Sequence, residues 1–146
     1  IRELLYTEPE QSGTSLKNAL DYLLKVSKRK SVVFIISDFL DQNYWPSLKV
    51  VNRKHDLIGI QLYDPAETDI PDMGLAKVED PETGESFWVD TSSKAARNRL
   101  RKDIQNRHEK FKKETRKIGF DLIPVATNQD FVEPLMSFFK KREKRH

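Results

Sequence analysis

The sequence of 146 residues contains no cysteine and no long hydrophobic run. The absence of cysteine excludes disulfide scaffolds, thiolate zinc sites and cysteine nucleophiles. No apolar run approaches the roughly 20 residues that a membrane helix needs, and no signal-peptide pattern opens the chain. We therefore expect a cytoplasmic chain with no membrane segment of its own, in a parent protein that could still be tethered to a membrane.

Several catalytic signatures are absent as well. The chain has no glycine loop ending in Gly-Lys-Ser or Gly-Lys-Thr, and no dinucleotide-binding fingerprint. Its histidines, His55, His108 and His146, are scattered, and none lies next to a nucleophile signature. A P-loop nucleotidase and a serine–histidine hydrolase are therefore not expected, and we expect His55 to lie at the C-terminal end of a helix.

Charge is abundant and unevenly distributed. Charged residues make up 34% of the chain and hydrophobic residues 37%, against about 25% charged in an average soluble protein. Residues 94–118 carry 11 Lys and Arg against 3 acidic residues, whereas the segments on either side are acidic. Such a basic stretch can bind nucleic acid. The less specific interpretation, which we favour, is a solvated helix whose charges oppose the acidic loops beside it.

Hydrophobic periodicity alternates between helical and strand patterns along the chain. Apolar residues at helical spacing predict helices over 15–28, 44–54, 90–118 and 131–139. Continuous apolar runs predict strands over 31–37, 57–63 and 120–126. Strands of this composition are typically buried on both faces in a parallel sheet covered by helices. The pattern therefore predicts an α/β domain with three parallel strands and helices on both faces.

Residues 73–91 interrupt this alternation. Two short strand-like runs, 74–79 and 86–90, flank Pro81-Glu82-Thr83-Gly84, which is typical of a hairpin turn. Phe87 and Trp88, in the second run, are expected to pack on their own sheet rather than to form a platform for stacking bases. Residues 1–6 resemble the end of a helix already begun, and three strands are few for such a sheet, so we expect a partial domain.

Polar side chains follow the predicted strands at the points where they end. In open parallel sheets, ligands bind beyond these carboxyl ends, and hydroxyl and carboxylate oxygens that converge there suit Mg²⁺ or Mn²⁺. Asp38 is the strongest candidate, because a carboxylate directly after a buried strand has few routine structural duties. Four further residues form a possible accessory rim: Ser15, Ser37, Asp41 and Asp64. Ser15 also suits a helix cap, and Asp64-Pro65 a turn.

Two segments near the start of the chain carry a family resemblance: 12–20 (Ser-Gly-Thr-Ser-Leu-Lys-Asn-Ala-Leu) and 33–39 (Val-Phe-Ile-Ile-Ser-Asp-Phe). They resemble the second half of a von Willebrand factor A domain. More narrowly, they are similar to the bacterial domain-of-unknown-function family fifty-eight, whose members accompany MoxR-type AAA+ ATPases. Residues 53–65 and 75–92 also fit this family, and the match extends from about 13 to 139.

The resemblance implies the fold in more detail. It points to a single partial domain over 1–146, the C-terminal half of a von Willebrand factor A-like, Rossmann-like three-layer α/β sandwich. Such a half would contain three parallel strands with helices on both faces, a hairpin inserted at about 73–91 and a basic tail at 140–146.

The resemblance also implies a metal-ion-dependent adhesion site. In the family, such a site takes a threonine from the Gly-Thr loop and an aspartate after the fourth strand, and these roles map onto Thr14 and Asp38. The other ligands come from an Asp-x-Ser-x-Ser loop that this chain lacks; Asp90-Thr91-Ser92-Ser93-Lys94 is the nearest match. The implication is Mg²⁺ or Mn²⁺ in the full-length protein, and an incomplete site without metal in this fragment.

The expected function is a non-enzymatic protein-interaction module that works with a MoxR-type AAA+ ATPase in remodelling or maturing an unidentified client protein. Two alternatives remain open. One is a metal-dependent nuclease or phosphohydrolase that uses Asp38, Asp41 and Asp64. The other is nucleic-acid binding through the basic helix at 94–117, which we expect less. We also expect the fragment to self-associate through the edge of strand 31–37, unless residues 1–6 cover that edge.

Overall fold

The structure is a computed structural model that describes residues 15–67, 70–80 and 84–144. Its elements in chain order are α2 (Leu16–Val26), β1 (Val32–Ser37), α3 (Trp45–Lys54), β2 (Asp56–Tyr63), the short 3₁₀ helix η1 (Pro65–Glu67), β3 (Leu75–Glu79), β4 (Ser86–Asp90), α4 (Lys94–Lys117), β5 (Asp121–Ala126) and α5 (Val132–Glu143). Every helix and strand predicted between residues 15 and 139 is present, with ends shifted by a few residues, whereas the helix end expected at 1–6 lies outside the described residues. None of the described helices is long and apolar enough to cross a membrane.

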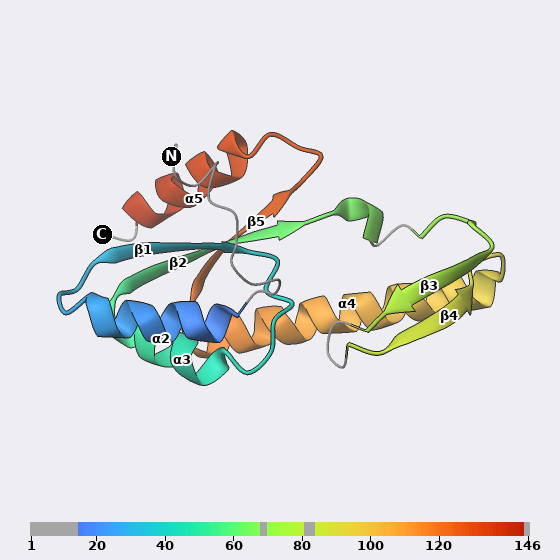
Figure 1. Cartoon of the computed structure of the whole chain (residues 1–146). Coiled ribbons are helices and arrows are strands. Elements are labelled where there is room, and N and C mark those ends of the chain that lie inside the picture. The colour runs from blue at the N-terminus through green and yellow to red at the C-terminus, as the bar shows by residue number, and fades with distance from the viewer. Residues whose placement is uncertain (1–14, 68–69, 81–83, 145–146) are drawn as a thin grey trace, which may run out of the picture.

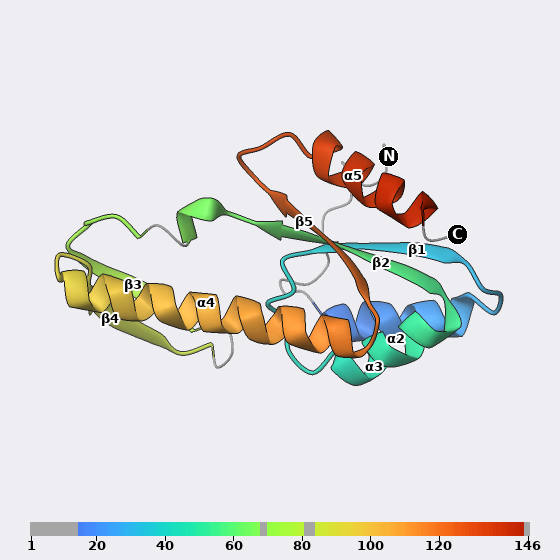
Figure 2. The ribbon, with the colours of Figure 1, turned by 180° about the vertical axis from the view of Figure 1, so that it is seen from behind.

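Three parallel strands form the central sheet in the order β1-β2-β5. β2 lies in the middle, with Val33 opposite Leu57 on one side and Ile60 opposite Ile123 on the other. Helix α5 covers one face of the sheet, whereas α2, α3 and the C-terminal part of α4 lie on the other face (Figures 1 and 2). The prediction of an α/β sheet with helices on both faces is confirmed.

The larger part of the core lies between the sheet and helices α2, α3 and α4. Leu48 and Val51 of α3 are fully buried there, and they pack with Leu20 of α2 and Leu57 of β2. A smaller core lies on the opposite face, where residues of β2 and β5 pack under Leu135 and Phe138 of α5. β2 is covered by helices on both faces and contributes to both cores. Because apolar burial drives folding, this strand is central to the stability of the domain.

The hairpin β3–β4 lies beside α4, beyond the end of the sheet (Figure 1). Its strands pair antiparallel, with Val78 opposite Phe87. The buried hydroxyl of Thr91 joins the hairpin to the start of α4, because it donates to the Gly74 carbonyl at 2.7 Å and accepts from the Met73 amide at 2.9 Å. The expected hairpin insertion at 73–91 is therefore confirmed; residues 81–83 of its turn lie outside the described residues.

The basic helix α4 begins and ends as its sequence indicates. The Ser93 side chain accepts from the Ala96 amide and caps the first turn, so the helix begins at Lys94, inside the predicted range 90–118. Gly119, with a φ of 62°, follows the last turn, in the left-handed conformation that commonly ends helices. Arg97 lies 3.9 Å from Asp72 and Arg107 lies 3.9 Å from Asp80. Part of the basic helix therefore opposes acidic loops, as the less specific interpretation expected.

Three expectations about packing were wrong. Strand β1 is not buried on both faces: Val32 and Ile36 are 59% and 65% exposed, because α5 packs mainly on β2 and β5. Helix α5 reaches β1 through Phe139, whose ring centroid lies 6.3 Å from that of Phe34. Trp88 is 64% exposed, so it does not pack on its own sheet as expected. In β4 it alternates with Phe87 and Val89, so its side chain lies on the other face of the hairpin from theirs. The segment from 140 is not simply a tail, because α5 continues to Glu143, and Arg142 forms ion pairs with Asp56 and Asp121.

The close packing at Gly59 yields a test of the core. A Cβ atom at this position in β2 would lie 2.5 Å from Cζ of Phe120. We predict that Gly59→Ala lowers the free energy of unfolding by about 1–3 kcal/mol, as overpacking does, measured by urea denaturation. Phe120→Leu in the same chain should recover part of that loss, because it removes the ring atom that the new Cβ meets. If the two substitutions changed the free energy of unfolding by strictly additive amounts, overpacking against Phe120 would not be the cause.

The outer edge of β1 yields a second test. No strand among the described residues pairs with this edge, and residues 1–6, the expected alternative cover, lie outside them. We predict that the chain self-associates and that Ile36→Lys makes it monomeric, because a lysine disfavours pairing along an edge strand. Analytical ultracentrifugation measures this. Val50→Lys, on exposed α3 surface, is the matched control, and a monodisperse wild-type monomer would overturn the prediction.

Candidate functional site

The carboxyl ends of β1 and β2 form one rim of the sheet, and the start of α2 reaches the same rim. The backbone amide of Leu16, in the first turn of α2, donates to Oδ2 of Asp41 at 2.5 Å, and Asp41 follows β1. The start of α2 is therefore tied to the loop after β1. Thr14 itself lies outside the described residues.

Asp38 lies directly after β1 with an exposed side chain. Its Oδ1 accepts from the Leu40 amide at 3.1 Å and lies 3.4 Å from the Ser37 hydroxyl, while that hydroxyl accepts from the Phe39 amide at 3.0 Å. These bonds use one carboxylate oxygen, and Oδ2 has no protein donor among the described residues. The carboxylate can therefore still accept a ligand from solvent.

The other rim candidates perform local structural work. Ser15 accepts from the Asn18 amide at 3.2 Å and caps α2. Asp41 accepts from two backbone amides, and Oδ1 of Asp64 accepts from the Ala66 amide at 2.9 Å, which starts η1. Within the described ranges, no three His, Cys, Asp or Glu side chains gather closely enough to hold a metal ion. Among the described residues, the rim therefore offers the exposed carboxylates of Asp38 and Asp64, each with one oxygen that has no protein donor, whereas both oxygens of Asp41 are engaged.

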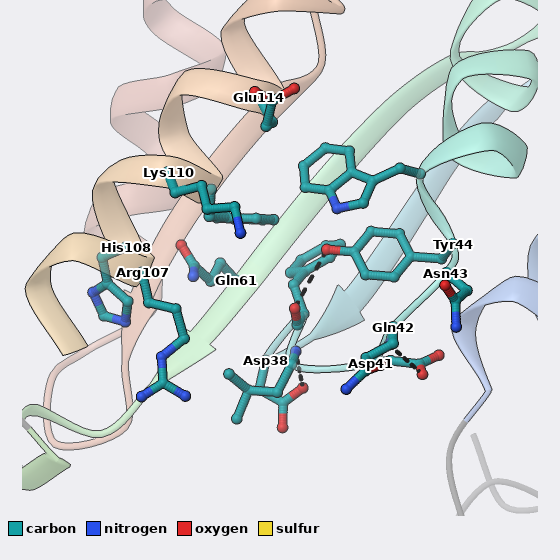
Figure 3. Close-up of a pocket in the computed structure, with 14 residues that line it drawn as sticks. Asp38, Asp41, Gln42, Asn43, Tyr44, Gln61, Arg107, His108, Lys110 and Glu114 are labelled. Atoms are coloured by element: carbon teal, nitrogen blue, oxygen red, sulfur yellow. Dashed lines mark hydrogen bonds between the residues drawn. The ribbon is translucent and has the colours of Figure 1, made fainter. Parts of the chain in front are cut away.

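A pocket of about 310 Å³ opens beside this rim, between the loop 38–44 and helix α4 (Figure 3). Its apolar lining is mostly aromatic, with Phe39, Tyr44, Trp45 and Phe111 beside the aliphatic Leu40. The Trp45 ring stacks on Tyr44 with centroids 5.2 Å apart and contacts Phe111 at 5.7 Å. The pocket lies at the carboxyl ends of parallel strands, where ligands bind in open α/β sheets.

The loop that forms one wall is held by Phe39. This residue has a φ of 60°, which is rare for a bulky side chain, and its ring is buried 5.3 Å from Phe111 and 6.0 Å from Phe120. The Tyr44 hydroxyl donates to the Phe39 carbonyl at 3.3 Å. Aromatic burial thus offsets the backbone strain and fixes the loop between Asp38 and Tyr44.

Gln61 is a functional candidate that the sequence analysis missed. It lies opposite Ser37 in the β1–β2 pairing, and its side chain points into the pocket (Figure 3). The residue is only 7% exposed, and no group among the described residues hydrogen-bonds to its amide. Buried polar groups normally have partners. The available signal was a single amide within the apolar run 57–63.

Charges of opposite sign face each other across the pocket. Asp38 and Asp41 lie on the loop side, whereas Arg107 and Lys110 lie on α4, together with the imidazole of His108 and the carboxylate of Glu114 (Figure 3). The sequence analysis treated these α4 residues only as part of a basic helix. Helical periodicity alone does not tell which of the many cations on α4 point to the sheet; the position of the helix decides it.

Burial also changes the acidity of the pocket's tyrosine. Tyr44 is 1% exposed, and this burial, together with the charges of Asp41 and Asp38, raises its pKa far above the ordinary value. The hydroxyl is therefore a stable hydrogen-bond donor throughout the physiological range, and it does not act as a general base.

Residues 1–110 match the family model described as "Protein of unknown function DUF58". The chain belongs to this family. The DUF58 match covers the rim, the hairpin and the first two-thirds of α4, and it confirms the more specific part of the resemblance seen in the sequence.

Mycobacterial proteins are similar to this DUF58 chain over most of its length. An uncharacterized protein of Mycobacterium avium is 26% identical over 132 residues, which is 88% of this chain and 76% of that protein. Uncharacterized proteins of Mycobacterium bovis and Mycobacterium tuberculosis are 26% identical over 129 residues, and the chain spans 40% of their length. No solved structure matches.

The raised pKa of Tyr44 predicts a loss of stability in alkali. Above pH of about 10, tyrosine ionises in the unfolded chain but stays protonated in the folded one, so the free energy of unfolding falls as pH rises. We predict a smaller fall in Tyr44→Phe, measured by urea denaturation across an alkaline pH series. For Tyr22→Phe, at a 66% exposed site, the free energy of unfolding should fall with pH as steeply as in the wild type. Equal slopes against pH in the wild type and both variants would contradict the raised pKa of Tyr44.

Proposed function

We propose that this chain is part of a non-enzymatic protein-interaction module of von Willebrand factor A type, in which Thr14 and Asp38 supply two ligands of a metal-ion-dependent adhesion site. The observation that carries the proposal is the bond from the Leu16 amide to Asp41. It brings the start of α2, which begins two residues after Thr14 in the sequence, to the rim on which Asp38 lies.

The chemistry of such a site follows from its ligands. Mg²⁺ and Mn²⁺ prefer hydroxyl and carboxylate oxygens and retain several waters. A cation held at this rim with an open position would accept a carboxylate from a partner protein as a further ligand, which would make binding depend on the ion. In this proposal, the missing ligands come from residues outside this chain, which spans less than half of two of its relatives.

The proposed partner is a MoxR-type AAA+ ATPase, and the proposed role is remodelling or maturation of a client protein in the cytoplasm. Both come from the resemblance of residues 12–20 and 33–39 to the family. The parallel sheet with helices on both faces supports the von Willebrand factor A-like interpretation. The enzymatic alternative has less support, because both carboxylate oxygens of Asp41 accept from backbone amides.

The metal proposal predicts that Asp38 is required for ion-dependent binding. In a longer protein that includes the upstream residues, Asp38→Ala should weaken Mg²⁺-dependent binding of a purified MoxR-type ATPase at least tenfold, or about 1.4 kcal/mol, measured by calorimetry. Asp64→Ala, another exposed carboxylate at the same rim, should retain most of the affinity.

Three other results would change this conclusion. Binding that is equal in EDTA and in Mg²⁺ would contradict a metal-bridged contact. Mn²⁺-dependent cleavage of an oligonucleotide that Asp38→Asn abolishes would favour the hydrolase. Tight oligonucleotide binding that weakens steeply with salt would favour nucleic-acid recognition by α4.

A further inference from the structure

The pocket between loop 38–44 and α4 contains a feature that the adhesion-site proposal does not use. Gln61 is only 7% exposed as a residue, its side chain points into the pocket, and its amide has no hydrogen-bond partner among the described residues (Figure 3). The amide atoms are not among the fully buried polar atoms without a partner, so they open onto the pocket and can form hydrogen bonds with a ligand that enters it. We propose that this pocket binds a mononucleotide.

The base of a nucleotide matches Gln61. A carboxamide presents a hydrogen-bond donor and an acceptor side by side, and every nucleobase carries a donor and an acceptor next to each other on one edge. Glutamine and adenine pair through two such bonds in protein–DNA complexes. Gln61 lies on β2 at the bottom of the pocket (Figure 3), so its amide meets the edge of a planar group that enters from the rim.

The aromatic lining provides a surface for the face of the base. Trp45 and Phe111 are partly exposed and line the pocket, and Tyr44 and Phe39 pack behind them. Their backing keeps the Trp45 ring in place. Nucleobases stack on such rings with little dependence on sequence, so the affinity comes from stacking and the orientation from Gln61.

The two charged walls match the remaining parts of a nucleotide. Arg107 and His108, on α4, face the pocket from one side and attract a phosphate. The ion pair of Arg107 with Asp80 is long, at 3.9 Å, so the guanidinium can turn to an anion. Asp38, on the other side, accepts from ribose hydroxyls, as acidic residues do in nucleotide sites.

The size of the pocket agrees with this ligand. A volume of about 310 Å³ suits a mononucleotide rather than a larger cofactor.

The chain offers a direct probe, because it contains only two tryptophans. In a Trp88→Phe background, Trp45 is the sole tryptophan, and its fluorescence reports occupancy of the pocket. Titration with AMP, GMP, CMP and UMP should give saturable quenching with at least one of them at sub-millimolar concentration. EDTA is present throughout, so the result is independent of the proposed metal site.

Gln61→Leu should weaken this binding at least about tenfold, because it removes both bonds to the base. The variant should fold with an unchanged or higher melting temperature, since leucine buries no unpaired amide. Gln129→Leu, an exposed glutamine after β5, is the matched control and should bind as tightly as the parent. Arg107→Gln should weaken the binding of AMP more than the binding of adenosine, because adenosine lacks the phosphate.

Three results would overturn the proposal. The first is no saturable quenching by any of the four nucleotides. The second is equal affinity in Gln61→Leu and the parent. The third is equal affinity for AMP and for ribose 5-phosphate, which would show that the site binds the phosphate and does not recognise the base.

Discussion

The burial of Phe39 is the contact on which the functional end of this molecule depends. Its ring lies against Phe111 of α4, Phe120 before β5 and Tyr44 before α3, so one side chain joins three parts of the core. Its backbone adopts a left-handed conformation that a bulky residue avoids unless its surroundings compensate. That conformation turns the chain sharply after β1. It places Asp38 on the rim and leaves the pocket between the loop and α4.

Two different kinds of site meet at this turn. On the rim, Asp38 offers an exposed carboxylate beside the start of α2, which suits a hydrated cation. Below it, Gln61 offers an unpaired amide that opens onto the pocket beside aromatic rings, which suits a planar ligand. Because Asp38 borders both, a group bound in the pocket would lie next to a cation on the rim, and each would alter the electrostatics of the other.

The sequence predicted much of the fold because its elements have strong local signals. The strand runs 31–37, 57–63 and 120–126 are mostly apolar, and Gly119 follows the last turn of α4. The site was predicted less well. Asp38 is found from its place after a strand. Asp41 carries the same sequence signal, but its carboxylate caps α2 from 25 residues away in the chain. No local pattern reveals such a long-range bond.

The order of apolar and polar residues by itself determined the strands, the helices and their alternation, because periodicity of 2 or 3.6 residues decides which side chains can be buried together. Only the tertiary structure decided which face of β1 is covered, which cations of α4 face the sheet and that Gln61 lies unpaired in a pocket. These properties depend on where α4 and α5 pack. Packing is set by shape complementarity between elements distant in the chain, which no single segment encodes.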